Sequence, residues 1–158
     1  MGCTLLQSTF ILKMSRHDAR VLALQVLYEA DTAQREAGVI LSRHFQEGEL
    51  AEGLRSYSSQ LVSGVVNQQA GLDKLISELA PDFPVGQLAA IDRNILRIAL
   101  WEMRYGDVPM KAAINEAVDI AKDFGSDTSA RFINGVQLAV DGGVEGIAPL
   151  TGAAFLKD

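Results

Sequence analysis

The chain has 158 residues, of which 48% are hydrophobic, so it is large enough for one domain with a sizeable core. Because it has a single cysteine, no intrachain disulfide or cysteine zinc site is expected, and a reducing, cytoplasmic compartment fits best. Its uncharged apolar runs are far shorter than the roughly 20 residues of a membrane-spanning helix, so no membrane span is expected. The net charge of −6 argues against a broad basic surface, which leaves a basic partner, a small positive patch, or both.

Residues 1–14 are mildly apolar and carry no charge before Lys13. They lack the early positive charge and the small-residue cleavage site of a secretory signal. Leu6 stands where a myristoylation motif has Ser or Thr. We therefore expect this segment to be a flexible N-terminal extension.

Apolar residues recur with helical spacing along the rest of the chain. Ser15 and Asp18 resemble a capping box at the start of the first stripe, which predicts a helix from about Arg16 to Ala33. A shorter helix is predicted over about 36–45, and the acidic, glycine-containing segment 46–53 is expected to be a loop. Further apolar stripes over 54–66, 72–79, 88–104 and 110–121 each predict a helix, and the last helix, which Ser126, Asp127 or Thr128 can cap, carries the stripe of Phe132, Ile133, Val136 and Val140.

Prolines fall between the predicted helices or in the tail. Pro81 and Pro84 interrupt regular structure, Pro109 suits the first turn of a helix, and Gly125 ends a helix just before Ser126 can cap the last one. No segment shows sustained period-two alternation, so strands are not needed. The sequence predicts an all-α fold with one helical domain over 15–140, followed by a glycine-containing tail, 141–158, that is expected to be disordered.

The sequence shows no convergent set of catalytic groups. His17 and His44 lie far apart without metal-ligand spacing, and the metalloprotease, phosphate-loop and nucleophile-elbow motifs do not occur. We therefore expect a binding protein rather than an enzyme, with no cofactor and no metal ion.

Two charged clusters are interpreted as helix-surface features. Glu116, Asp119 and Asp123 follow the spacing i, i+3 and i+7, so they share one helix face. A metal–carboxylate site is the alternative to a solvated acidic face. The second cluster is interpreted as charge pairs on a helix surface: Asp92, Arg93, Arg97 and Glu102.

Positive charge gathers at the start of the first predicted helix. Lys13, Arg16, His17 and Arg20 lie there, and the i, i+4 spacing of Arg16 and Arg20 places them on one face. A helix N-terminus also presents free N–H groups to phosphates. This patch is a candidate RNA or DNA contact, and a basic helix start without a ligand is the alternative.

A second candidate contact lies around the start of the last helix. Lys122 and Arg131 flank its cap, and Phe132 follows. An aromatic ring beside positive charge holds unpaired bases by stacking and phosphate attraction. The alternative is that Phe132 is an ordinary core residue on its apolar stripe.

Three stretches resemble the NusB family of bacterial transcription antitermination factors. Ala19-Arg20 with ALQVLY (23–28) is similar to the family's opening helix, and DRNILRIALWEM (92–103) to its central helix. Val108-Pro109, AINEAV (113–118), AKDFG (121–125) and FINGV (132–136) are similar to its C-terminal signature. The resemblance covers about residues 16–140 in the expected order, and the combination is more specific than any one piece.

This resemblance implies an all-α fold of about seven helices in two packed subdomains. It implies two partners, the small-subunit ribosomal protein NusE and the single-stranded boxA RNA of ribosomal RNA leaders, within the RNA polymerase antitermination complex. Arg16, His17 and Arg20 match the family's arginine-rich start and are expected to contact RNA phosphates. Tyr28 falls where the family meets its protein partner. Phe132 falls at the RNA-facing start of the last helix, with Lys122 and Arg131 as supporting candidates.

The chain departs from the family pattern at several positions. His17 and Asp18 occupy places often held by Arg, Thr128 stands where some members have an acidic residue, and Gly71 where some have an aromatic. We therefore expect weak intrinsic RNA binding and a strong dependence on the protein partner. Two alternatives are the NusB-like module of an rRNA cytosine methyltransferase, which needs a further catalytic domain after residue 140, and a helical interaction protein without RNA binding.

Overall fold

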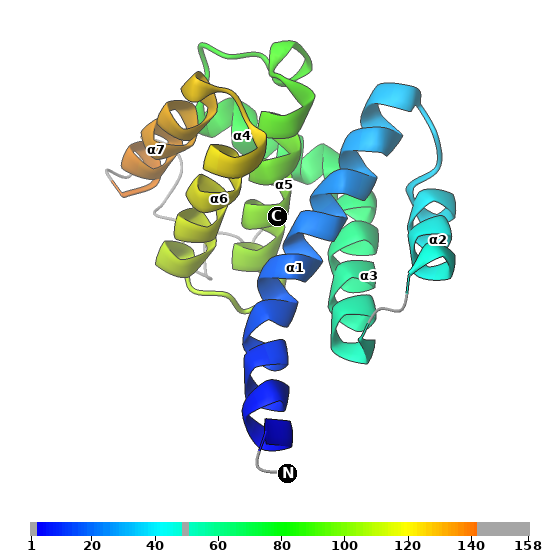
Figure 1. Ribbon diagram of the computed structural model, residues 1–158. Helices are drawn as coiled ribbons and strands as arrows, with labels where there is room; N and C mark the ends of the chain where they lie inside the picture. The colour runs from blue at the N-terminus through cyan, green and yellow to red at the C-terminus, as the bar shows by residue number, and fades with distance from the viewer. Residues whose placement is uncertain (1–2, 49–50, 142–158) are drawn as a thin grey trace. The chain divides into compact units, whose positions relative to one another are not determined.

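The computed structural model describes residues 3–48 and 51–141, and side chains are described for 16–48 and 51–136. All regular structure in these ranges is helical, with seven α-helices and one short 3-10 helix (Figure 1). The chain divides into two compact units, Met1–Gly64 and Val65–Asp158. The predicted all-α class is thereby confirmed.

The first unit contains α1 (Cys3–Ala33), α2 (Ala37–Glu47) and most of α3 (Glu52–Asn67). Helix α2 packs alongside the second half of α1 (Figure 1). The apolar stripe of α1 is buried as its spacing predicts, together with apolar residues of α2 and α3. These buried side chains are Ala19, Ala23, Leu24, Val26, Leu27, Ala37, Ile40, Leu41, Leu61 and Val62.

Helix α1 begins at Cys3 rather than near Arg16, so the capping pattern at Ser15 lies inside it. No proline or glycine occurs between Cys3 and Ser15, which leaves nothing in that stretch to end the helical geometry. Residues 1–2 and the tail beyond Asp141 lie outside the described residues. The flexibility expected of residues 1–14 and of the tail stays a prediction.

The connection from α1 to α2 is fixed by backbone and ionic contacts. Gln34 takes the left-handed conformation with φ 51°, and the N–H of Arg35 donates to the carbonyl of Ala30 at 3.2 Å, which is the closing bond of a Schellman motif. Arg43 on α2 then donates two hydrogen bonds to the carboxylate of Glu29 on α1, at 2.7 and 3.0 Å. These contacts set the register of α2 on α1.

The second unit contains α4 (Gln69–Leu79), a 3-10 turn (Val85–Gln87), α5 (Ala90–Tyr105), α6 (Met110–Phe124) and α7 (Asp127–Asp141). Helix α5 is its centre and packs against α4, α6 and α7. Every residue from Asn94 to Glu102 is buried, which confirms that this stripe lies at the centre of the core. Its large buried apolar neighbours are Leu72, Leu75, Ile76, Leu79, Ile114, Val118, Ile120, Ile133 and Val136.

The predicted surface charge pairs on α5 are wrong for three residues, because Asp92, Arg97 and Glu102 are buried. The guanidinium of Arg97, 5% exposed, donates from Nε and Nη2 to both carboxylate oxygens of Asp73 on α4, at 2.7 and 2.9 Å. It also donates to Asn94 at 3.1 Å. The spacing of residues in the sequence identifies partners on the same helix, whereas the carboxylate partner of Arg97 is Asp73 on α4.

The helix boundaries otherwise follow the predicted stripes closely. Pro109 is the N-cap of α6 rather than a first-turn residue, since the helix begins at Met110. Leu88, predicted as helical, precedes α5 and follows the 3-10 turn. Within the described residues, no helix combines the length and the hydropathy needed to cross a membrane.

We predict that Asp73→Ala lowers the free energy of unfolding by about 3 kcal/mol, because it leaves the buried guanidinium of Arg97 without its carboxylate. The low end of the usual range applies because the Asp73 side chain is 28% exposed. Lys74→Ala, at the exposed neighbouring position, should change it by at most about 0.5 kcal/mol. Urea unfolding followed by circular dichroism measures both, and equal losses contradict a structural role for the ion pair.

Candidate nucleic-acid interface

In the first unit, Arg16 and Arg20 of α1 both lie against the ring of Tyr57 on α3. The guanidinium carbon of Arg16 is 5.0 Å from the ring centroid, and that of Arg20 is 5.9 Å away. Both distances are within the range of a cation–π contact. Arg20 is only 6% exposed, whereas Arg16 is exposed. We call these three residues the arginine–tyrosine stack, in which Arg16 is the member that faces solvent.

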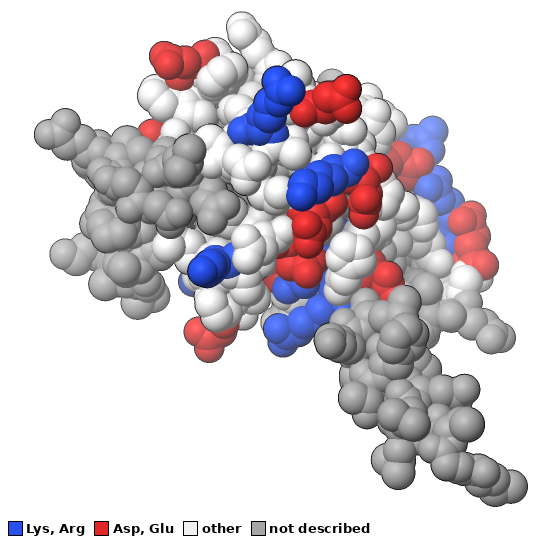
Figure 2. Space-filling model, turned by 60° about the vertical axis from the view of Figure 1, so that its left-hand side comes forward, with Lys and Arg blue, Asp and Glu red and all other residues white. Residues whose placement is uncertain are grey.

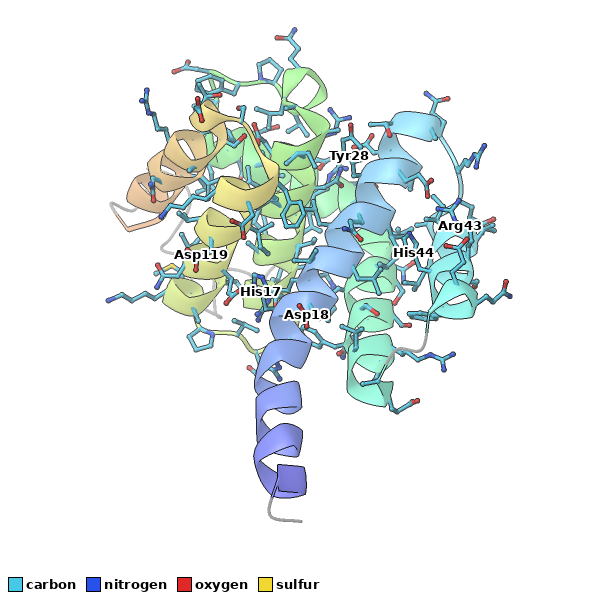
Figure 3. The ribbon with its side chains drawn as sticks, in the orientation of Figure 1. His17, Asp18, Tyr28, Arg43, His44 and Asp119 are labelled. Atoms are coloured by element: carbon cyan, nitrogen blue, oxygen red, sulfur yellow. The ribbon has the colours of Figure 1, made fainter. Side chains whose placement is uncertain are left out.

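The other predicted residues of α1 are His17 and Tyr28 (Figure 3). His17 is half-buried, and Tyr28 is 40% exposed. Their i, i+11 spacing corresponds to about three helical turns, so both lie on the same face of α1. An exposed tyrosine offers an apolar ring with a polar tip, which suits a protein contact.

In the second unit, a groove of about 640 Å³ opens between α7 and the segment that joins α4 to α5. Phe83 from this segment and Phe132 from α7 line it, and their rings meet edge to face with centroids 5.2 Å apart and planes at 71°. Phe83 is 52% exposed and Phe132 half-buried. Phe132 is therefore a wall of the groove and not a fully enclosed core residue.

Three charged residues also line this groove, and the first is the exposed Asp82 of the segment between α4 and α5. The exposed Arg131 comes from α7, directly before Phe132. Asp92 comes from the first turn of α5 and is 9% exposed, and its Oδ1 atom is buried without a hydrogen-bond partner. A buried oxygen of this kind is costly unless a donor reaches it. The groove is thus lined by two aromatic rings, one cation and two carboxylates, of which only that of Asp82 is exposed.

Lys122 and the acidic face of α6 lie outside this arrangement. Lys122 is exposed in the last turn of α6 and does not line the groove. Asp119 and Asp123 are exposed on the same helix. Across the described residues, no group of three or more His, Cys, Asp or Glu side chains could hold a metal ion. The solvated acidic face is therefore the interpretation that the geometry favours.

Charge on the described surface is mixed. On the face drawn in Figure 2, acidic and basic side chains are interspersed, and no broad, uniformly positive field appears among the described residues. This agrees with the net charge of −6. Neither the net charge nor this face indicates a broad basic surface.

Residues 17–139 match the sequence profile of the NusB family. The chain belongs to the NusB family. A transcription antitermination protein NusB from Chloroflexus aggregans is 41% identical over 128 residues, which cover 79% of this chain and 85% of the relative. Another, from Dehalococcoides mccartyi, is 46% identical over 127 residues, covering 80% and 89%. These relatives are described as antitermination proteins and not as enzymes, which agrees with the absence of a catalytic cluster in the sequence.

Solved NusB structures share the fold. NusB of T. maritima superposes with a TM-score of 0.72 at 23% identity, covering 90% of this chain and 97% of that one. A crystal structure of the antitermination factors NusB and NusE in complex with double-stranded RNA gives a TM-score of 0.68 at 22% identity, covering 80% and 95%. The helical arrangement typical of NusB proteins is therefore confirmed for this chain.

Sequence reasoning missed three residues of these sites. Tyr57 was not selected because it is a single aromatic residue on an apolar stripe. Phe83 was not selected because it is a single aromatic residue in a loop. The signal for Phe83 was its place between Pro81 and Pro84, since an aromatic in a segment without helix packing has no core to enter. Asp92 was assigned to the surface because spacing shows only the neighbours on its own helix.

A tight turn between α6 and α7 positions Arg131 and Phe132. The N–H of Ser126 donates to Oγ of Ser129 at 2.9 Å, which is the backward bond of a capping box. Gly125 ends α6 as predicted, but as the C-cap with an ordinary φ of −91° and not as a left-handed C′ residue. A Cβ atom at Gly125 would lie 2.5 Å from the side chain of Ser129 and 2.8 Å from the carbonyl of Ala121. The absence of a side chain, not an unusual backbone, is what this turn requires.

We predict that Gly125→Ala lowers the free energy of unfolding by about 1–3 kcal/mol, because the added methyl group overlaps both helix ends. Gly71→Ala is the matched control, since a Cβ at this position in α4 meets nothing within 4 Å. It should stabilise the fold by about 0.5–1 kcal/mol, as alanine does inside helices. Thermal melts measure whether each substitution raises or lowers stability. A Gly125→Ala variant that is more stable than the wild type contradicts the predicted steric overlap at this turn.

Proposed function

We propose that this chain is a transcription antitermination factor that binds the boxA RNA of ribosomal RNA leaders jointly with the ribosomal protein NusE. In this role it joins the RNA polymerase antitermination complex in the bacterial cytoplasm. The observation that carries the proposal is the groove in which Phe83 and Phe132 lie beside Arg131, within a chain of the NusB family.

The groove suits an unpaired base better than a duplex. Aromatic rings stack on the faces of bases, which are accessible only where the strand is unpaired. Arg131 can attract the neighbouring phosphate. The arginine–tyrosine stack gives the first unit a separate phosphate contact through Arg16.

The acidic balance of the chain supports a joint site with a basic partner. Ribosomal proteins that bind RNA carry positive charge, and a chain with net charge −6 attracts them electrostatically. A similar structure contains NusB and NusE in complex with double-stranded RNA, which supports an assembly of this kind. In this arrangement Tyr28, exposed on α1, is proposed to contact the partner, with His17 and Lys122 as further RNA contacts.

The relatives that bear the antitermination name favour this function over the methyltransferase module. A helical interaction protein without RNA binding is the remaining alternative. It is distinguished by experiment rather than by fold, because all of these proteins would share the same helices.

We predict that the chain and NusE together bind single-stranded boxA RNA at least tenfold more tightly than either protein alone, because each supplies only part of the phosphate contacts. Fluorescence anisotropy of a labelled boxA strand at matched salt measures the affinities, and affinity should fall as salt rises. A duplex of the same sequence is the control and should bind more weakly.

Equal binding by the chain alone contradicts the joint site. Preference for the duplex contradicts the stacking role of the groove. Formation of the protein pair without any RNA affinity supports the interaction module in place of the antitermination factor.

We predict that Phe132→Ala weakens RNA binding by about 1–3 kcal/mol, the usual contribution of one base–aromatic stack, while the domain stays folded. Phe124→Ala is the matched control, because this exposed phenylalanine at the end of α6 does not line the groove. Anisotropy and circular dichroism are measured on both variants. A collapsed fold for Phe132→Ala supports the core role instead, and equal RNA losses for both variants contradict the groove as the base site.

A further inference from the structure

We infer that Tyr57 is a positioning residue for RNA binding, whose ring holds the guanidinium of Arg16 at the place where it meets a phosphate of the strand. The inference rests on the proposed function and adds to it a residue of α3 that has no charge and no motif. Tyr57 acts through Arg16, so its contribution should disappear when Arg16 is removed.

The geometry places Tyr57 under both arginines of α1. Arg16 and Arg20 are one helical turn apart, and a single ring on α3 lies within 6 Å of both guanidinium carbons. Tyr57 is itself half-buried, so its ring is held by its surroundings while one face remains available to the arginines. The ring therefore sets where the basic side chains in the middle of α1 point.

The two arginines differ in burial, which indicates different roles. Arg20, at 6% exposure, has little surface to offer a ligand and anchors α1 on Tyr57. Arg16 is exposed and can reach a phosphate. This refines the expectation that both arginines contact RNA phosphates: Arg16 is the contact, and Arg20 and Tyr57 fix its place.

An arginine whose side-chain conformation is already restricted binds a phosphate more tightly than one that samples many conformations. An exposed arginine samples many side-chain conformations, and binding must restrict them at an entropic cost. Stacking on Tyr57 restricts Arg16 before RNA arrives, while the guanidinium N–H groups in the plane stay available to phosphate oxygens. In a chain with few basic residues at this position, such pre-organisation has a large share in the affinity.

The first unit also contains a control pair. Arg55 of α3 lies 5.1 Å from the ring centroid of Phe45 on α2, which is nearly the same geometry as Arg16 on Tyr57. Removal of Phe45 deletes one cation–π contact between two helices of this unit, and removal of Tyr57 deletes two. Only Tyr57 lies against the arginines proposed to face RNA.

The test is a double-mutant cycle with the full chain, saturating NusE and labelled single-stranded boxA RNA. Tyr57→Leu should weaken RNA binding roughly two- to fivefold, the range expected for one exposed cation–π contact. In the Arg16→Gln background the same substitution should change the affinity by less than about 1.5-fold, because the group that Tyr57 positions is gone. Tyr57→Phe keeps the ring and should bind like the wild type, and Phe45→Leu should also leave the affinity unchanged.

The salt dependence gives a second readout. Arg16→Gln should reduce the slope of log affinity against log salt by about 0.7, the value for one phosphate contact on a single strand. Thermal melts identify variants that fail to fold, and Tyr57→Met replaces Tyr57→Leu in that case, since the flexible thioether fills a similar space without a ring.

Each outcome bears on a different claim. A wild-type pair that binds no RNA overturns the proposed function and the positioning role with it. Wild-type binding with an unchanged Tyr57→Leu variant, or an equal loss in the Arg16→Gln background, overturns the positioning role alone. A loss of the same size for Phe45→Leu shows that ring removal acts through the stability of the unit, which also overturns it.

Discussion

The burial of α5 is the constraint on which the second unit depends. Its residues from Asn94 to Glu102 are all enclosed, so α4, α6 and α7 must cover it on different sides. A buried charge on such a helix is stabilised where a partner is supplied, as Asp73 does for Arg97. The ion pair therefore ties α4 to α5 at a fixed register, and the segment between them is held at both ends.

The groove is a consequence of this arrangement. The connecting segment passes over the first turn of α5 and carries Phe83, and α7 brings Phe132 and Arg131 to the same place. Asp92 lies where α5 begins, so its carboxylate is enclosed by the packing that buries the rest of the helix. The site has no reactive pair of groups, and its chemistry is that of stacking, charge attraction and hydrogen-bond acceptance. These are the properties of a binding surface.

Much of the fold could be predicted because helical periodicity is a local signal. The stripe over 88–104 and its capping neighbours depend on residues a few positions apart, and α5 and α6 lie close to where they were expected. The contacts between helices could not be predicted from spacing. The Arg97–Asp73 pair, the ring of Tyr57 under Arg16 and the position of Phe83 against Phe132 all join residues that are distant in sequence. The start of α1 was misplaced because a capping pattern also occurs inside helices.

We propose that boxA RNA contacts the groove of the second unit and, in the first unit, the exposed Arg16 of the arginine–tyrosine stack. Photo-crosslinking of 4-thiouridine-substituted boxA RNA to the chain in its complex with NusE, with the crosslinked peptides identified by mass spectrometry, tests this claim most directly. The account predicts crosslinks at or next to Phe83 and Phe132 and in the peptide that contains Arg16. Crosslinks confined to α2 or to the acidic face of α6 contradict it.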